Sequence, residues 1–351
     1  MTDLGDLLTW RESSTSGEAI EAALGAADRA PSAARDLLAS AERIVITGAG
    51  SSYYLAQAVA AVARATLSKD VLAAPLSELI LRPEGVLTGR DGAREPVIII
   101  SRSGSTSEAV AVAEQMRRAG HPTLAVTCRG DSPLAAHVDR TLVSPAGDEA
   151  AIVMTRSFAS MLALLLAIVA AAAGDRVLAG DLRRLPGRWH EASEAAEVGR
   201  RLGATPWSRV VVLGGGPAIG IAAEWGLKLT ETSQVATSAY EPLELRHGPI
   251  SVCEPGVLVV GLVSGAGFAE EVAVVEEAAR FGATTWLIAD DEAARGRAEA
   301  VSVAGGGIHP FARLPLLLHP GHALALTIAL ARGRDPDSPR HLGQVVILGA
   351  D

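Results

Sequence analysis

The sequence predicts an α/β fold made of two duplicated domains, each a mostly parallel sheet flanked by helices in three layers. Short β-rich runs alternate with helical stretches along the chain, which is typical of strand–helix–strand units. Three matched pairs mark the repeat: Gly48 and Gly214, Gly104 and Gly265, Thr123 and Thr285. Their offsets of 166, 161 and 162 residues are nearly equal, which indicates a duplication.

The elements follow in the same order in both copies. In the first copy we expect strands at 43–47, 97–100 and 123–127 and helices at 53–67 and 107–118. In the second we expect strands at 209–213, 257–263 and 284–289, with helices that end at Leu229 and Arg280. The predicted organisation is therefore an N-terminal helical segment at 1–30, domains at 31–180 and 190–332, and a tail at 333–351 that covers the active site.

One apolar stretch has to be assigned to the core or to a membrane. Phe158 to Ala173 is sixteen residues without a charge, whereas about 20 apolar residues are needed to cross the hydrocarbon core. The alternating elements on both sides favour a helix buried between layers. We therefore expect no membrane partner.

Composition and charge exclude several classes of protein. The chain has 351 residues, 49% apolar and 20% charged, with a net charge of -9, which argues against binding nucleic acid by bulk electrostatics. The two cysteines form no CxxC pair, so neither disulfides nor a cysteine metal site is expected. No signal peptide is visible at the N-terminus, because no basic region is followed by an apolar block, so a cytoplasmic location is expected. Gly48-x-Gly50-x-x-Tyr53 lacks the third glycine of a dinucleotide motif, and no cofactor is expected.

Hydroxyl side chains gather after two strands of the first copy, where parallel sheets bind ligands. They are Ser51, Ser52, Ser101, Ser103, Ser105 and Thr106. The matching loops of the second copy, Gly214-Gly-Gly-Pro and Ser264-Gly-Ala-Gly, are nearly stripped of hydroxyls. Serine and threonine also cap helices, but one cap per helix does not account for six hydroxyls. The six hydroxyls therefore favour the binding of a phosphate dianion.

The second copy carries residues suited to moving protons. Glu224, Lys228 and Glu231 fall on one helix face, an arrangement that is more often a solvated ion-pair surface than a catalytic site. His247 stands before Gly248-Pro249 in a tight turn, and a carboxylate with an imidazole suits acid/base chemistry. His319-Pro-Gly-His322 indicates a loop rather than a metal pair, and no metal is expected.

Five motifs together resemble the tandem SIS (sugar isomerase) family. They are Gly48-Ala-Gly-Ser-Ser, Ser101-Arg-Ser-Gly-Ser-Thr-Ser-Glu108, Thr155-Arg-Ser-Phe158, Leu227-Lys-Leu-Thr-Glu231 and Glu244-Leu-Arg-His-Gly-Pro249. The most similar group is the isomerase half of glutamine-fructose-6-phosphate aminotransferase, with free-standing amino-sugar-phosphate deaminases, ketose/aldose isomerases and fructosamine-phosphate deglycases.

The resemblance implies roles for individual residues. The implied phosphate contacts are Ser51, Ser52, Ser101, Ser103 and Thr106. Glu231 would move a proton between C1 and C2, and His247, supplied by the neighbouring subunit of a homodimer, would assist opening of the sugar ring. Lys228 would lie near the substrate. Further sugar-binding or loop candidates are Gly50, Arg102, Ser105 and Gln344, with Arg102 able to contact the phosphate or pair with Glu108.

Two departures from the family pattern shape the expected reaction. The chain begins Met1-Thr2-Asp3 without a glutaminase half, so we expect that it does not draw ammonia from glutamine. Gln344 stands where the aminotransferase has the lysine that forms an imine with the ketose. The expected activity is aldose/ketose proton transfer on a 6-phosphorylated amino sugar, with deamination of the glucosamine-6-phosphate type. The alternatives are a fructosamine-6-phosphate deglycase, a simple ketose/aldose phosphate isomerase, and a non-catalytic phosphosugar sensor, which would need neither Glu231 nor His247.

Overall fold

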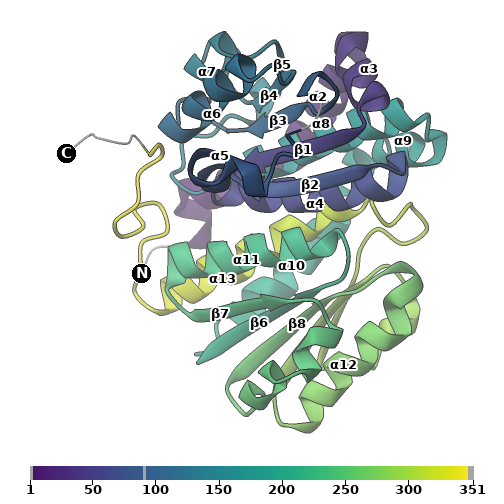
Figure 1. The fold of residues 1–351 in the computed structure, drawn as a ribbon. Coiled ribbons are helices and arrows are strands. Elements are labelled where there is room, and N and C mark those ends of the chain that lie inside the picture. Colours follow the sequence, from purple (N-terminus) through teal and green to yellow (C-terminus); the bar gives the residue numbers. More distant parts are fainter. Residues whose placement is uncertain (1–2, 90–91, 347–351) are drawn as a thin grey trace. The chain divides into compact units, whose positions relative to one another are not determined.

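The computed structural model describes residues 3–89 and 92–346 and divides into two compact units (Figure 1). The first unit contains residues 16–150, 156–183 and the tail from Gly343. The second unit contains the chain up to Thr15, residues 151–155 and residues 184–342. Each unit holds one copy of the predicted repeat, and the predicted tail at 333–351 is described as far as Val346.

The first unit is built on a parallel sheet, which within the described residues has five strands in the order β2-β1-β3-β4-β5. The strands are β1 (Arg43–Gly48), β2 (Asp70–Pro75), β3 (Val97–Ile100), β4 (Thr123–Thr127) and β5 (Arg140–Val143). Its helices are α2 (Ser16–Arg29), α3 (Ser32–Ser40), α4 (Ser51–Leu67), α5 (Leu76–Leu81), α6 (Ser107–Arg118), α7 (Pro133–Ala136), α8 (Arg156–Ala173) and α9 (Arg176–Leu182).

The second unit repeats this topology with a second parallel sheet, in the order β10-β9-β8-β6-β7 over the described residues. The strands are β6 (Arg209–Gly214), β7 (Ala236–Tyr240), β8 (Val257–Leu262), β9 (Thr284–Ala289) and β10 (Ala300–Val303). The helices are α1 (Leu8–Ser14), α10 (Trp189–Gly203), α11 (Ala218–Ser233), α12 (Phe268–Arg280) and α13 (Leu318–Ala331). The duplicated α/β fold predicted from the sequence is confirmed.

Alternate residues along each strand supply two apolar faces, as the two-residue period of a strand requires. In the first sheet, Val45, Val97 and Ile99 pack with buried side chains of α5 and α6. In the second, Val211 and Val259 pack with α12, which Figure 1 shows on the face of the sheet opposite α10, α11 and α13. Both sheets are therefore middle layers of three.

Two helical stretches, 156–173 and 314–331, are long and apolar enough to cross a membrane by length and composition alone. Most of each stretch is nevertheless buried inside the protein, 72% of the first and 83% of the second. The first is α8, which packs against α2 and α4. Its burial confirms the prediction of a core helix over Phe158 to Ala173.

The turn after β6 gives a test of the packing between strand and helix. A methyl group at Gly214 would overlap the carbonyl oxygen of Ala218, just as one at Gly48 would lie 2.5 Å from the backbone of Ser52. We expect Gly214→Ala to lower the free energy of unfolding by about 2 kcal/mol, because the close turn must shift. Urea unfolding measures the change.

Gly226→Ala is the matched control, since a methyl group there meets nothing within 4 Å and the residue lies inside α11. Helix propensity predicts that this variant gains about 0.5–1 kcal/mol. Equal changes in the two variants would contradict the packing argument.

Candidate functional site

The residues predicted to bind phosphate follow the carboxyl ends of two central strands of the first sheet. In the strand order β2-β1-β3-β4-β5, the chain adds β2 on one side of β1 and then β3 on the other side. Open α/β sheets bind ligands at this switch in strand order, here between β1 and β3. Ser51 and Ser52 begin α4 directly after β1, and Ser101 to Thr106 join β3 to α6. Parallel neighbours are about 4.8 Å apart, so both loops end at the same crevice.

The loop backbone gives these hydroxyls their positions. Gly50 precedes α4 with φ of 55°, in the left-handed region that favours glycine. Thr106 is the N-cap residue of α6, and the hydroxyl of Ser103 accepts a hydrogen bond from the backbone N–H of Ser105 at 3.2 Å. Ser51 and Ser103 are buried, whereas Ser105 is partly exposed. The predicted set thus surrounds two helix N-termini within the first unit.

Arg102 contacts Glu149 and the tail among the described residues, and its proposed contact with a phosphate or with Glu108 stays a prediction. Its buried guanidinium lies 3.7 Å from Glu149, whose side chain is fully buried, and it donates to the carbonyl oxygen of Gln344 at 3.1 Å. Glu149 also accepts hydrogen bonds from the backbone N–H of Arg156 and the hydroxyl of Ser157. Sequence reasoning missed Glu149, because only the fold brings residue 149 beside residue 102.

Gln344 is held by the first unit through its own amide. Its side-chain nitrogen donates to the carbonyl oxygens of Glu149 at 2.9 Å and Ala150 at 3.4 Å. Two residues later, the carbonyl oxygen of Val346 accepts from the backbone N–H of Ser107 at the start of α6. The described part of the tail therefore lies against the loop that follows β3.

In the second unit, α11 carries a buried lysine between two carboxylates. Lys228 is 2% exposed, and its Nζ lies 2.5 Å from Oε2 of Glu231 and 3.5 Å from Oε1 of Glu224. The Glu224 side chain is fully buried, while that of Glu231 is 19% exposed. This face of α11 is therefore not a solvated ion-pair surface, and only the Glu231 carboxylate reaches solvent appreciably.

His247 lies away from this cluster along the same sheet. Helix α11 runs back along the sheet between β6 and β7, so Glu231 in its last turn lies near the amino end of β7. His247 is exposed and follows the carboxyl end of β7, after a short 3-10 helix at Leu243–Arg246. A strand of five residues is about 15 Å long. The structure thus does not bring Glu231 and His247 of one chain together within this unit.

His319 and His322 lie in the first turns of α13, and the prediction of a loop there is wrong. Proline is tolerated in the first turn of a helix, because the N–H it lacks would have no partner there. Both imidazoles contact the Ser13 hydroxyl through Nδ1, at 2.8 and 2.7 Å. Burial lowers the pKa of His319 to about 4, and burial together with His319 and the Lys228 ammonium lowers the pKa of His322.

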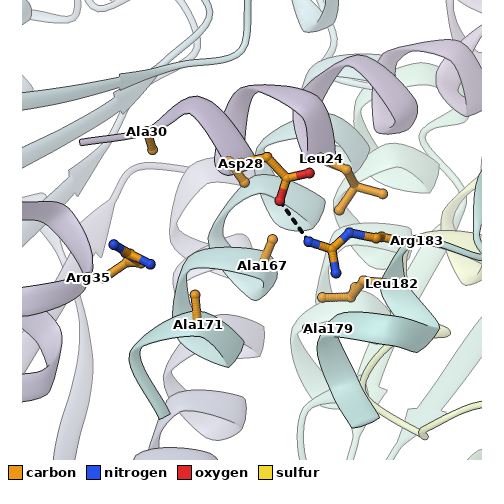
Figure 2. Close-up of a pocket in the computed structure, with 10 residues that line it drawn as sticks. Leu24, Asp28, Ala30, Arg35, Ala167, Ala171, Ala179, Leu182 and Arg183 are labelled. Atoms are coloured by element: carbon orange, nitrogen blue, oxygen red, sulfur yellow. Dashed lines mark hydrogen bonds and ion pairs between the residues drawn. The ribbon is translucent and has the colours of Figure 1, made fainter. Parts of the chain in front are cut away.

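The first unit also contains a cavity of about 210 Å³ among helices α2, α3, α8 and α9 (Figure 2). Asp28 accepts a hydrogen bond of 2.8 Å from Arg183 on one side of the cavity. Figure 2 shows this pair together with Ala167 and Ala171 of α8, which also line the cavity. No predicted site residue lines it among the described residues. Three exposed charged residues, Asp28, Arg35 and Arg183, line the cavity together with leucine and alanine side chains.

The buried cluster on α11 gives a test of how Lys228 stabilises the unit. We expect Lys228→Met to lower the free energy of unfolding by about 3–5 kcal/mol, because it leaves the buried Glu224 carboxylate without its counter-ion. Adding Glu224→Gln should recover part of this loss. Urea unfolding measures both variants.

Lys69→Met is the control, since the chain's other lysine donates to the carbonyl oxygens of Ala39 and Ala41 and pairs with no carboxylate among the described residues. Its expected cost is about 1 kcal/mol. A loss for Lys228→Met no larger than this control would contradict a structural ion pair.

The chain is similar to known proteins along most of its length. The chain is 30% identical over 334 residues to glutamine-fructose-6-phosphate aminotransferase of Aeropyrum pernix, covering 89% of this chain and 52% of that protein. The enzyme of the same name from Gluconobacter oxydans is 29% identical, with 88% and 52% covered. The chain therefore spans about half the length of these relatives.

Solved structures show the same fold. The C-terminal domain of glucosamine-fructose-6-phosphate aminotransferase from Francisella tularensis superimposes with a TM-score of 0.85 at 20% identity, covering 94% of this chain and 98% of that one. Glucosamine-6-phosphate deaminase from Thermotoga maritima superimposes with a TM-score of 0.79 at 25% identity, covering 97% and 99%. The SIS domain model matches residues 37–171 and 205–299, and the chain therefore belongs to the SIS domain family.

Proposed function

We propose that this protein deaminates a 6-phosphorylated amino sugar of the glucosamine-6-phosphate type, yielding a ketose phosphate and ammonia. The observation that carries the proposal is the Glu231 carboxylate, partly exposed and held 2.5 Å from a buried ammonium. An anionic base with a fixed direction is what proton transfer between two sugar carbons requires. The relatives named aminotransferase and deaminase support the substrate class.

The hydroxyl loops of the first unit supply the proposed phosphate site. Hydroxyl and backbone N–H groups at the starts of α4 and α6 would donate to the phosphate oxygens, and each helix terminus adds about 0.3–1 kcal/mol for an anion. The proposed contacts are Ser51, Ser52, Ser101, Ser103 and Thr106. An anchored phosphate would restrict the orientations that the sugar chain can adopt.

In the proposed reaction, the amino sugar phosphate and water give a ketose phosphate and ammonia. His247 assists opening of the ring to the aldehyde, and Glu231 then removes the proton from C2 and delivers it to C1. The aldehyde oxygen gains a proton and the amine nitrogen loses one, so that C1 becomes a CH2OH group and the nitrogen remains on C2 as an imine. Water adds to this imine, the C–N bond breaks, and ammonia leaves with the ketose phosphate as the other product.

The side chains present favour a substrate that brings its own nitrogen. The amide of Gln344 is not a nucleophilic amine, and its nitrogen donates to two backbone carbonyls. The Lys228 ammonium contacts two carboxylates, which favour its charged and non-nucleophilic form. An imine between enzyme and ketose is therefore not part of the proposed reaction.

A homodimer is part of the proposal, because Glu231 precedes the amino end of β7 and His247 of the same chain follows its carboxyl end. A second copy related by twofold symmetry would bring its His247 to the Glu231 of the first. Each dimer would then contain two shared sites.

A product panel tests the proposed activity. The protein is incubated with the 6-phosphates of glucosamine, fructose and a fructosamine, and ammonia, ketose and amino acid are assayed. We expect ammonia and ketose phosphate from the amino sugar, and a 10²–10⁴-fold loss of turnover in Glu231→Gln with phosphosugar affinity nearly unchanged. Glu254→Gln, on an exposed loop, should keep full turnover.

Each other outcome of the panel points to a different function. Release of amino acid from the fructosamine phosphate would indicate a deglycase, and interconversion of ketose and aldose without ammonia an isomerase. Tight binding without any product would indicate a sensor. Equal loss of binding and turnover in Glu231→Gln would assign that residue a structural role.

Hybrid dimers test the shared site separately. Glu231→Gln and His247→Ala proteins are each expected to be inactive, and they are mixed under conditions that allow subunit exchange. Random exchange makes half of the dimers mixed, and each mixed dimer regains one of its two sites, so about a quarter of wild-type activity should return. An absence of recovery, with exchange verified by mass-labelled subunits, would refute the shared site.

A further inference from the structure

The second unit has its own crevice at the position that corresponds to the hydroxyl loops of the first. Its strand order reverses between β6 and β8, as the first reverses between β1 and β3. The loops after β6 and β8 line a cavity of about 270 Å³, together with Pro310 and Phe311. Among the described residues that line it, Glu271 is the one with a charged side chain.

The Glu271 carboxylate lies where a bound anion would be expected. Glu271 is in the first turn of α12, and the backbone of Ser264 in the loop after β8 favours the ionised form of its carboxyl group. A methyl group at Gly215 would overlap its Oε1, and one at Gly267 would lie 3.1 Å from the same atom. The carboxylate thus fits against the bare backbone of both loops.

The first unit has a different pair of residues at these places. Gly104 and Gly265, with φ of 61° and 66°, occupy matching turns, and the same offset of 161 pairs Val110 with Glu271. The offset between Gly48 and Gly214 likewise pairs Ala49 with Gly215. Val110 packs against the apolar core of the first unit. The two copies therefore differ at two neighbouring positions. The second copy has the Glu271 carboxylate in place of Val110, and it has Gly215 in place of Ala49, which leaves room for that carboxylate.

The Glu271 side chain is partly buried, and charges of both signs lie near it. Burial raises the pKa of its carboxyl group, Asp290 and Glu270 act in the same direction, and the Ser264 backbone and the charge of Arg313 offset only part of this rise. The Arg313 guanidinium is itself fully buried and donates to the carbonyl oxygens of Ala304, Val263 and Ile288. A phosphate entering this crevice would meet a like charge at its helix N-terminus.

We propose that the Glu271 carboxylate is a resident anion that fills the crevice of the second unit, so that this crevice excludes phosphate esters. Each chain then binds one phosphosugar, in the hydroxyl loops of its first unit. The exclusion rests on the geometry of the second unit, whereas the statement about the first unit rests on the proposed function.

Binding stoichiometry tests the exclusion. Bound inorganic phosphate is counted per chain by equilibrium dialysis of the full-length protein. We expect one phosphate for the wild type and two for Glu271→Ala, with the additional site the weaker. Phosphate should also raise the Tm of Glu271→Ala more than that of the wild type, because it replaces the missing carboxylate. If the alanine variant does not fold, Glu271→Gln removes the charge while it retains the shape of the side chain.

Glu270→Ala is the matched control, since Glu270 is exposed in the same turn of α12 and does not line the crevice. It should still bind one phosphate. A wild type with two phosphates, or a Glu271→Ala protein with no additional one, would overturn the proposal.

A Ser101→Ala/Ser103→Ala protein separates this inference from the proposed function. It should bind no phosphate, and one after Glu271→Ala is added. If the wild type binds none while Glu271→Ala binds one, the phosphate site proposed for the first unit is wrong and the exclusion by Glu271 stands.

Discussion

The ion pairs of Lys228 inside α11 are the interaction on which the rest of the candidate site depends. A buried ammonium is stable only when carboxylates compensate its lost hydration, and here Glu224 and Glu231 do so from the same helix face. Because Glu224 is fully buried and Glu231 is not, the cluster has an inner, structural side and an outer, accessible side. The outer carboxylate is held in one direction before any substrate arrives, which reduces the reorganisation that proton transfer would require.

The two units show how one topology can be given two different chemistries. Both sheets have the same strand order, and both place loops and helix N-termini at the point where that order reverses. The first unit fills these loops with hydroxyls, while the second has glycines that admit a carboxylate from its own helix. Backbone N–H groups at a helix N-terminus attract anions, so the side chains at a few loop positions are what distinguishes the two crevices.

The sequence predicts the parts of this fold that are buried on both sides. The central strands β1, β3, β4, β6, β8 and β9 are continuous apolar runs, and all of them appear at the predicted places. The four strands that were not predicted, β2, β5, β7 and β10, are the edges of the two sheets. Edge strands are partly exposed, as in Ala236–Tyr240, where no residue is buried, so their composition does not differ from that of loops.

At the site, the sequence indicates which residues carry chemistry but not their surroundings. The spacing of Glu224, Lys228 and Glu231 is the same on a solvated face and on a buried one, and only packing against α13 distinguishes the two. The pairing of Arg102 with Glu149 joins positions 47 residues apart through the fold.

At Gln344 the sequence shows which side chain is present, and only the structure shows what it contacts. The sequence indicates the loss of an amine at this position, and the structure gives the replacement a task of its own, since its amide and backbone join the tail to Glu149 and Arg102. A lysine side chain that reached for a substrate carbonyl could not donate to the carbonyl oxygens of Glu149 and Ala150 at the same time. Gln344 is therefore an anchor for the chain, and under the proposed function proton transfer falls to Glu231 on α11.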